Sequence, residues 1–296
     1  MNYKTRTGFT LVELLVVIGI IALLMAILLP TLSKARQSAK TLVCLSQIRQ
    51  LQTAQIFYAN DNRGYFVQAG LGHGGHDDDH SRGFVRQDDD DDHHDEHGEL
   101  DSDVSWLVAL SDYAPEALVG RCPSDASPHW PDGVPVEQGD HDDGHDDDDD
   151  DGHDEGPLFR RTSYGINNYL SISAAPEGHE RRWVKLTQIK NNSQVVQFLE
   201  MAETGPFAAA DHPDLHELDV TAEEPFEPAS EMLAIGMHGR DGTKPVPGPR
   251  SRANFGFIDG HAETRSFDTI YIDAYENHFN PELWFQTVER PGDVSR

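Results

Sequence analysis

The chain has 296 residues and a formal net charge of −29 at pH 7, with 52 acidic residues against 23 basic ones. Lysine and arginine supply most of a protein's affinity for phosphate, so this balance argues against nucleic acid or anionic lipid as a partner bound through bulk charge. It favours cationic partners, above all divalent metal ions.

The first element that the sequence predicts is a long apolar helix, residues 9–30. From Phe9 to Leu29 there are 21 residues, of which only Thr10 and Glu13 are polar. A helix of that length extends about 30 Å at about 1.5 Å per residue, which matches the hydrocarbon thickness of a bilayer. We therefore expect this segment to anchor the precursor in the inner membrane.

The leader ahead of this helix, residues 1–8, differs from a conventional secretory signal. Such a signal has its small-residue cleavage site after the apolar run, whereas here Gly8 comes before it. Cleavage after Gly8 would remove the leader and leave the apolar helix on the mature protein. The leader contains Lys4 and Arg6 and no acid, which predicts a cytoplasmic N-terminus.

This arrangement resembles the class III signal of type IV pilins and type II secretion pseudopilins, with the matching residues Gly8, Phe9, Thr10, Leu11, Glu13 and Pro30. The resemblance implies that a prepilin peptidase cleaves after Gly8 and methylates the new N-terminus, Phe9. It also implies that Glu13 pairs with the N-terminal amine of a neighbouring subunit. A carboxylate inside a membrane costs roughly 2.5–3.5 kcal/mol, so it needs such a partner. The alternative is an ordinary single-span anchor.

A stalk helix, residues 31–60, is expected to follow the apolar segment. These residues contain no Gly or Pro, their apolar side chains recur at helical spacing, and residues 60–64 form a C-cap and turn signal. Pro30 lies inside the pattern and should kink the helix. A helix this long cannot bury itself. Its stalk half needs the rest of the chain and its apolar half needs lipid or further copies, so we expect a homo-oligomeric filament.

Residues 61–296 predict an extracytoplasmic α+β domain, in which a small antiparallel sheet packs on the stalk helix. Residues 194–201 are expected to form one strand. A series of short motifs looks like that of pseudopilin-like proteins with a C-terminal His…Asp-Gly motif, common in planctomycetes and related bacteria. The motifs are residues 44–51, 58–62, 106–107, 121–125, 163–167, 186–190 and 254–261. That family usually places its histidine closer to the aspartate, whereas here His238 lies 21 positions before Asp259.

Residues 253–267 predict a β-hairpin. Asp259 and Gly260 have the chemistry of a two-residue type I′ turn, which would place Phe257 opposite Ala262.

Two histidines, His238 and His261, lie near this hairpin in the sequence and allow two interpretations, a functional cluster or ordinary turn and strand positions. Together with Asp259 they would form a metal or catalytic cluster. The simpler interpretation, which we favour, assigns Asp259 to the turn and His261 to a strand face. The sequence contains no recognisable catalytic motif, such as a P-loop or an HExxH helix, so we expect a protein that is not an enzyme.

The chain has two cysteines, Cys44 and Cys122. Outside the cytoplasm such a pair predicts one disulfide bond, which would tie the stalk helix to the outer domain. A closed loop of 78 residues is worth roughly 4 kcal/mol by the chain-entropy argument. The alternatives are two free buried thiols or a pair of metal ligands, although the spacing excludes a CxxC zinc motif.

Two low-complexity inserts, residues 73–103 and 140–156, contain 24 of the 52 acids. They have few apolar residues to offset the entropy of ordering, so we expect disordered loops. Their mixed ligands would suit Ca²⁺, Zn²⁺ or Ni²⁺. The candidate ligands are His73, His76, His80, His93, His94, His97, His141, His145, His153, Asp147, Asp149 and Asp151.

The three aspartates, with Gly152, imitate the start of an EF-hand loop, but Leu158 stands where its final glutamate belongs. Three hypotheses for the role of the inserts stay open: weak multivalent metal binding, an ordered stoichiometric metal site, and a solvated acidic brush that binds no metal specifically.

The sequence as a whole predicts a structural subunit of a pilin-like filament, either a type IV pilus or a type II secretion pseudopilus. Its expected partners are further copies, the inner membrane, the prepilin peptidase and the assembly machinery, and the mature protein is expected in a periplasmic or cell-surface filament. One alternative is a minor pseudopilin that recruits exported cargo. Another is a membrane-tethered metal-binding protein that never polymerises.

Overall fold

The computed structural model describes residues 10–69, 106–114, 120–136, 158–171, 183–215, 218, 226–238 and 247–284. The helices are α1 (Leu11–Asp61), α2 (Trp106–Ser111), α4 (Phe226–Met232) and α5 (Phe267–Ile270), with short 3₁₀ turns at Asn168–Leu170, Leu186–Gln188, Pro206–Ala208 and Pro281–Trp284. The strands are β1 (Tyr164–Ile166), β2 (Val196–Glu200), β3 (Arg252–Phe257), β4 (Ala262–Ser266), β5 (Tyr271–Asp273) and β6 (Glu276–Asn277).

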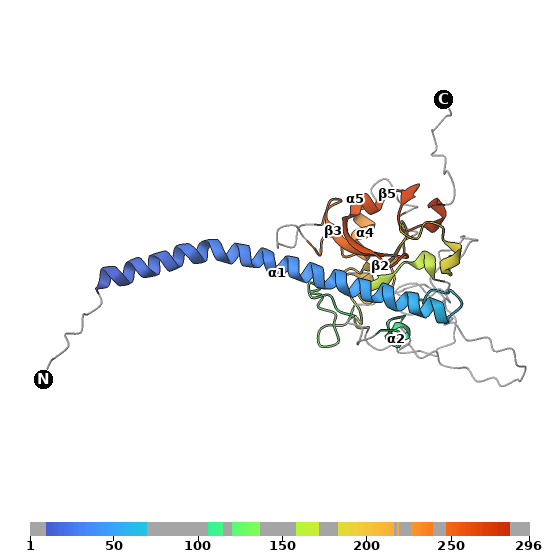
Figure 1. Ribbon diagram of the computed structural model, residues 1–296, viewed down its shortest axis with the longest axis horizontal. Coiled ribbons are helices and arrows are strands. Elements are labelled where there is room, and N and C mark those ends of the chain that lie inside the picture. Colours follow the sequence, from blue (N-terminus) through green and yellow to red (C-terminus); the bar gives the residue numbers. More distant parts are fainter. Residues whose placement is uncertain are drawn as a thin grey trace, which may run out of the picture.

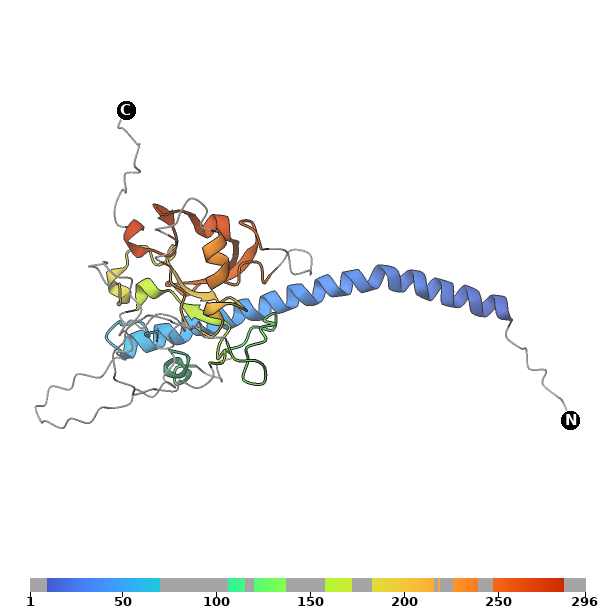
Figure 2. The same cartoon turned by 180° about the vertical axis from the view of Figure 1, so that it is seen from behind.

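Helix α1 has 51 residues and is therefore about 76 Å long. It begins at a capping box, in which the Thr10 hydroxyl accepts from the backbone of Glu13 and the Glu13 carboxylate accepts from the backbone of Thr10. It ends where Arg63 and Gly64 adopt positive φ angles. The helix predicted from the sequence is confirmed, and it continues through Pro30. Figures 1 and 2 show that α1 bends within the half that projects away from the domain.

The sheet has the order β1-β2-β3-β4, and each strand runs antiparallel to its neighbours. Its central strand β2 is buried along its whole length. The stalk half of α1 crosses β3 closely at Gly256, where an added Cβ would lie 2.6 Å from Ile48 Cγ2. A glycine at this position lets the helix and the sheet approach each other.

Helices lie on both sides of the sheet (Figure 1), and a hydrophobic cluster fills the space on each side. On one side α1 and α2 contribute residues such as Ile48, Leu51 and Trp106, which cluster with Phe198 of β2. On the other side α4, α5 and the β5–β6 ribbon pack against β2 and β3, in a cluster that includes Phe255 and Phe267. The observed fold is the α+β arrangement that the sequence predicts.

The β3–β4 hairpin forms, but its predicted register is wrong by one residue. Ala262 pairs with Gly256, not with Phe257, and the loop has three residues that end in Gly260 at φ 96°. The cause is Ile258, which is 1% exposed and donates its backbone N–H to Val195 O at 3.1 Å. Because Ile258 belongs to a core cluster beside the sheet, the turn includes it as an extra residue.

A disulfide bond joins Cys44 of α1 to Cys122, as the sequence predicts. Both cysteines are fully buried, and their Cα atoms are 5.1 Å apart. The bond links the stalk helix to a segment 78 residues further along the chain, where Cys122 also packs in the same hydrophobic cluster as α1.

Replacing both cysteines by alanine should lower the free energy of unfolding of the outer domain by about 2–4 kcal/mol, since the unfolded chain regains the entropy of a long open loop. Guanidinium unfolding of the full chain in detergent would measure this. A dithiol reductant should lower the midpoint of the wild-type protein and leave that of the double variant unchanged. Equal midpoints for oxidised wild type and double variant would contradict a stabilising role.

Candidate functional site

The N-terminal half of α1 is an apolar rod that the domain does not cover. Its large hydrophobic side chains from Leu11 to Leu29 are 45–78% exposed, whereas the helix is buried against the domain from Cys44 onward. By length and composition α1 could cross a membrane. Fully burying one such side chain is worth about 1.5–3 kcal/mol, so the rod has a strong tendency to enter lipid or contact other apolar helices.

Glu13 lies in the first turn of this rod. Its Oε2 atom accepts hydrogen bonds from the backbone N–H and the hydroxyl of Thr10, both at 2.8 Å. These bonds hold the carboxylate at the helix N-terminus, and a carboxylate still has lone pairs for further donors. The predicted processing residues Gly8 and Phe9 precede Thr10 and lie outside the described residues.

Pro30 lies where the apolar rod meets the stalk. Because proline has no N–H, the carbonyl four residues earlier loses its usual helical donor. The residues that follow Pro30 are basic: Lys34, Arg36 and Lys40 are exposed, and residues 31–60 contain no acid. A chain with a net charge of −29 therefore has a positively charged stalk.

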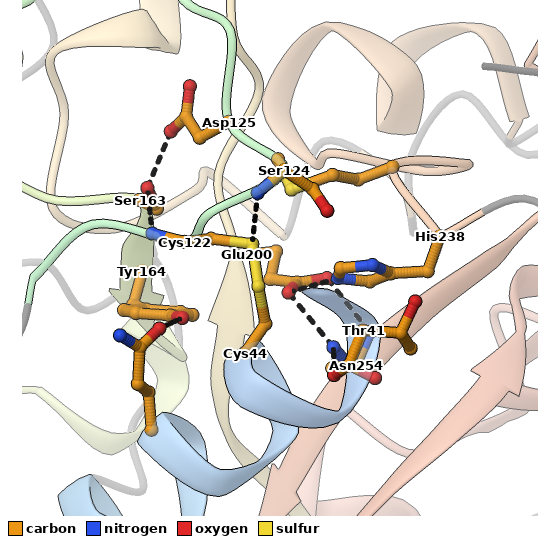
Figure 3. The surroundings of a disulfide bond; sticks show 12 residues. Thr41, Cys44, Cys122, Ser124, Asp125, Ser163, Tyr164, Glu200, His238 and Asn254 are labelled. Atoms are coloured by element: carbon orange, nitrogen blue, oxygen red, sulfur yellow. Dashed lines mark hydrogen bonds and ion pairs between the residues drawn. A yellow bond between two sulfur atoms is a disulfide. The ribbon is translucent and has the colours of Figure 1, made fainter. Parts of the chain in front are cut away.

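A polar cluster is buried beside the disulfide, where β2 and β3 face the stalk (Figure 3). Glu200 Oε1 lies 2.7 Å from His238 Nε2, and both side chains are fully shielded from solvent. Asn254 donates its backbone N–H to Glu200 Oε2 at 2.9 Å and its side-chain amide to Oε1 at 3.1 Å. Within the described part of the chain, His238 Nδ1 has no hydrogen-bond partner.

A second buried cluster joins Asp125 to Arg160. The guanidinium donates Nε to Asp125 Oδ2 at 2.9 Å and lies 2.8 Å from the same oxygen through Nη2. It also donates to the carbonyl oxygens of Met201, Ala202 and Ala208. Burial lowers the pKa of Arg160, and the Asp125 carboxylate opposes that shift. This cluster connects the segment after Cys122 to the end of β2.

Sequence reasoning missed Glu200, Asp125, Arg160 and Asn254. One signal was present: Glu200 ends a strand in which every residue is buried, and a charge in such a strand requires a partner. Its partner His238 is 38 residues away, so no local pattern reveals the pair.

Of the possible cluster of His238, Asp259 and His261, only the last two come together, with Asp259 Oδ1 2.5 Å from His261 Nδ1. Asp259 Oδ1 accepts the backbone N–H of His261 at 3.1 Å, and the His261 ring stacks on Phe257. His238 lies beside the other end of β3, where its backbone N–H reaches Arg252 O. The turn interpretation of Asp259 is confirmed.

The predicted metal ligands of the two acidic inserts all lie outside the described residues. They are His73, His76, His80, His93, His94, His97, His141, His145, His153, Asp147, Asp149 and Asp151, and their binding of Ca²⁺, Zn²⁺ or Ni²⁺ stays a prediction.

Comparison with known proteins concerns the N-terminal region. The prokaryotic N-terminal methylation motif matches residues 3–29. The type IV wide pilus major component PilA4 of Thermus thermophilus is 45% identical over 62 residues, which are 21% of this chain and 47% of the relative. The chain thus spans about half the length of this curated relative. No solved structure matches. These findings support a chain whose N-terminal region is similar to type IV pilins.

Proposed function

We propose that this chain is a structural subunit of a pilin-like filament. In this proposal the precursor is anchored in the inner membrane by the apolar half of α1, a prepilin peptidase removes residues 1–8, and the mature chain assembles through the same half. The observation that carries the proposal is the long uncovered apolar rod, whose sequence matches the N-terminal methylation motif. The stalk half of α1 belongs to the domain core, so the domain and the rod lie on one continuous helix.

The chemistry of Glu13 supports assembly between copies. Removal of the leader would create a new amine at Phe9, one residue before the Thr10 cap. In the filament, the Phe9 amine of a neighbouring subunit would provide an opposite charge for the Glu13 carboxylate. Moving Glu13 from the membrane into the filament core then costs little free energy. An uncleaved chain has no amine at this position, so cleavage and assembly are coupled in the proposal.

Charge segregation supports the same arrangement. The stalk carries Lys34, Arg36, Lys40 and Arg49 without an acid, and the rest of the chain is strongly acidic. Copies stacked along a filament axis would place a basic stalk near the acidic domains of neighbours. Complementary charges of this kind steer association and fix register. The name of the relative, a wide pilus component, favours a type IV pilus over a type II secretion pseudopilus.

Mass spectrometry of the full chain from a host with a prepilin peptidase tests this function. We expect the mature protein to begin at Phe9 with one added methyl group, and to be recovered in sheared surface fibres. A Gly8→Val variant should keep residues 1–8, remain in the membrane and be absent from the fibres. A wild-type chain that begins at Met1 and stays monomeric would contradict the proposal.

A further inference from the structure

Four side chains of types that bind metals lie close together at the disulfide, two of them its own cysteines. Cys44, Cys122, Glu200 and His238 can each offer one ligand atom, and these atoms all lie within 4.8 Å of one another. The residues come from α1, from the segment after residue 120, from the end of β2 and from the segment after α4. Figure 3 shows the Glu200 carboxylate and the His238 ring beside the two bonded sulfurs.

His238 has features of a ligand rather than of a packed core side chain. The residue is 3% exposed, and its hydrogen bonding within the described residues is to Glu200 through Nε2, while Nδ1 has no partner there. A buried polar atom without a partner is disfavoured. Because this is the one hydrogen bond of the imidazole within the described residues, the ring can exchange it for a cation without breaking a second hydrogen bond there.

The Glu200 carboxylate is held in a position from which it can serve as a ligand. Asn254 donates two hydrogen bonds to it, one to each oxygen, and such bonds orient a ligating carboxylate. The Glu200 and His238 atoms are 2.7 Å apart. Two nitrogen and oxygen ligands of a tetrahedral zinc are about 3.4 Å apart, given bonds of about 2.0–2.2 Å, so only a small widening is needed.

The charge balance of this site changes with the oxidation state of the cysteines. The disulfide is neutral and leaves Glu200 and His238 paired with each other. Two buried thiolates beside a buried carboxylate would be strongly disfavoured without a cation. A divalent ion that accepts thiolate and imidazole ligands resolves this, and zinc fits that ligand set far better than calcium or magnesium.

We propose that Cys44, Cys122, Glu200 and His238 hold one zinc ion in the folded chain before the disulfide is made, and that oxidation of the cysteines expels the metal. The oxidant is an external disulfide. The two thiolates give it two electrons and become the Cys44–Cys122 bond, while the external disulfide takes up two protons and becomes two thiols. The metal leaves with water as its ligands. The site is independent of the acidic inserts and of the filament function.

Cobalt is the probe that tests this site, because thiolate ligands give bound cobalt a near-ultraviolet charge-transfer band that histidine and carboxylate ligands do not. The full chain in detergent is reduced with a phosphine and titrated with cobalt, then with zinc. We expect a band that saturates at one cobalt per chain, disappears on adding zinc, and is absent from the oxidised protein. Oxidised glutathione should abolish the band and release the metal.

Matched variants identify the ligands. Glu200→Gln and His238→Asn should each weaken cobalt binding in the reduced protein at least about tenfold, whereas His261→Asn, at a partly exposed turn, should not. Cobalt bound by the acidic inserts would give no thiolate band, so the band reports the cysteine site alone. A reduced wild-type chain that gives no band, or that unfolds despite the metal, would overturn the proposal. So would a band unaffected by both Glu200→Gln and His238→Asn.

Discussion

A Glu13→Gln subunit should insert into the inner membrane normally and be nearly absent from filaments. Breaking a buried charge pair costs about 3–5 kcal/mol, which corresponds to a loss of about 100-fold or more in the equilibrium constant for adding a subunit. Glutamine keeps the size of the side chain and remains compatible with the capping box at the start of α1. The substitution therefore removes the charge while leaving the helix N-terminus capped.

Two further variants separate charge from capping. Thr10→Ala should cost about 1 kcal/mol of capping and leave filaments abundant, because the carboxylate is retained. Glu13→Leu should insert at least as well as the wild type, since it removes a membrane cost of roughly 2.5–3.5 kcal/mol, and should still fail to assemble. Comparing the subunit in membrane and sheared-fibre fractions measures both. Fibres that contain the Glu13→Gln subunit at wild-type yield would disprove the pairing.

Features of this fold that depend on local sequence were predictable. The apolar run after Gly8 predicts the exposed rod. The capping box was not predicted, although Thr10 with Glu13 three residues later fits its pattern. The cysteine pair predicts the disulfide, because two cysteines outside the cytoplasm leave one pairing. Each of these inferences uses residues that are close in sequence, or, for the disulfide, two cysteines that allow one pairing.

Features that depend on tertiary contacts were not predictable. The hairpin turn was identified from Asp259 and Gly260, but its register is decided by Ile258, which bonds to Val195 in another part of the chain. The buried acid Glu200 similarly has partners on two different elements. A sequence shows that such a charge needs a partner, but only the folded chain shows which residue it is.

The buried pair of Asp125 and Arg160 is expected to give the largest loss of stability among single substitutions in the outer domain. Asp125→Ala leaves the Arg160 guanidinium fully buried without its counter-ion, since both side chains are 0% exposed. Breaking one partner of a buried pair costs about 3–5 kcal/mol. It also removes the acceptor of the Ser163 hydroxyl, so the link between the Cys122 segment and β1 weakens as well.

Guanidinium unfolding of the full chain in detergent would measure this loss. Asp132→Ala, at an exposed position on the same segment, is the matched control and should change stability by no more than about 0.5 kcal/mol. Replacing both members, as Asp125→Ala with Arg160→Met, should recover part of the loss, because a buried pair is far less costly to replace than to break. If Asp125→Ala were as stable as the control, Arg160 would have to be neutralised by another group. Glu203 also favours the charged guanidinium, but less than Asp125 does. The carbonyl oxygens of Met201, Ala202 and Ala208 accept the hydrogen bonds of the guanidinium but carry no charge, so we expect the loss to be observed.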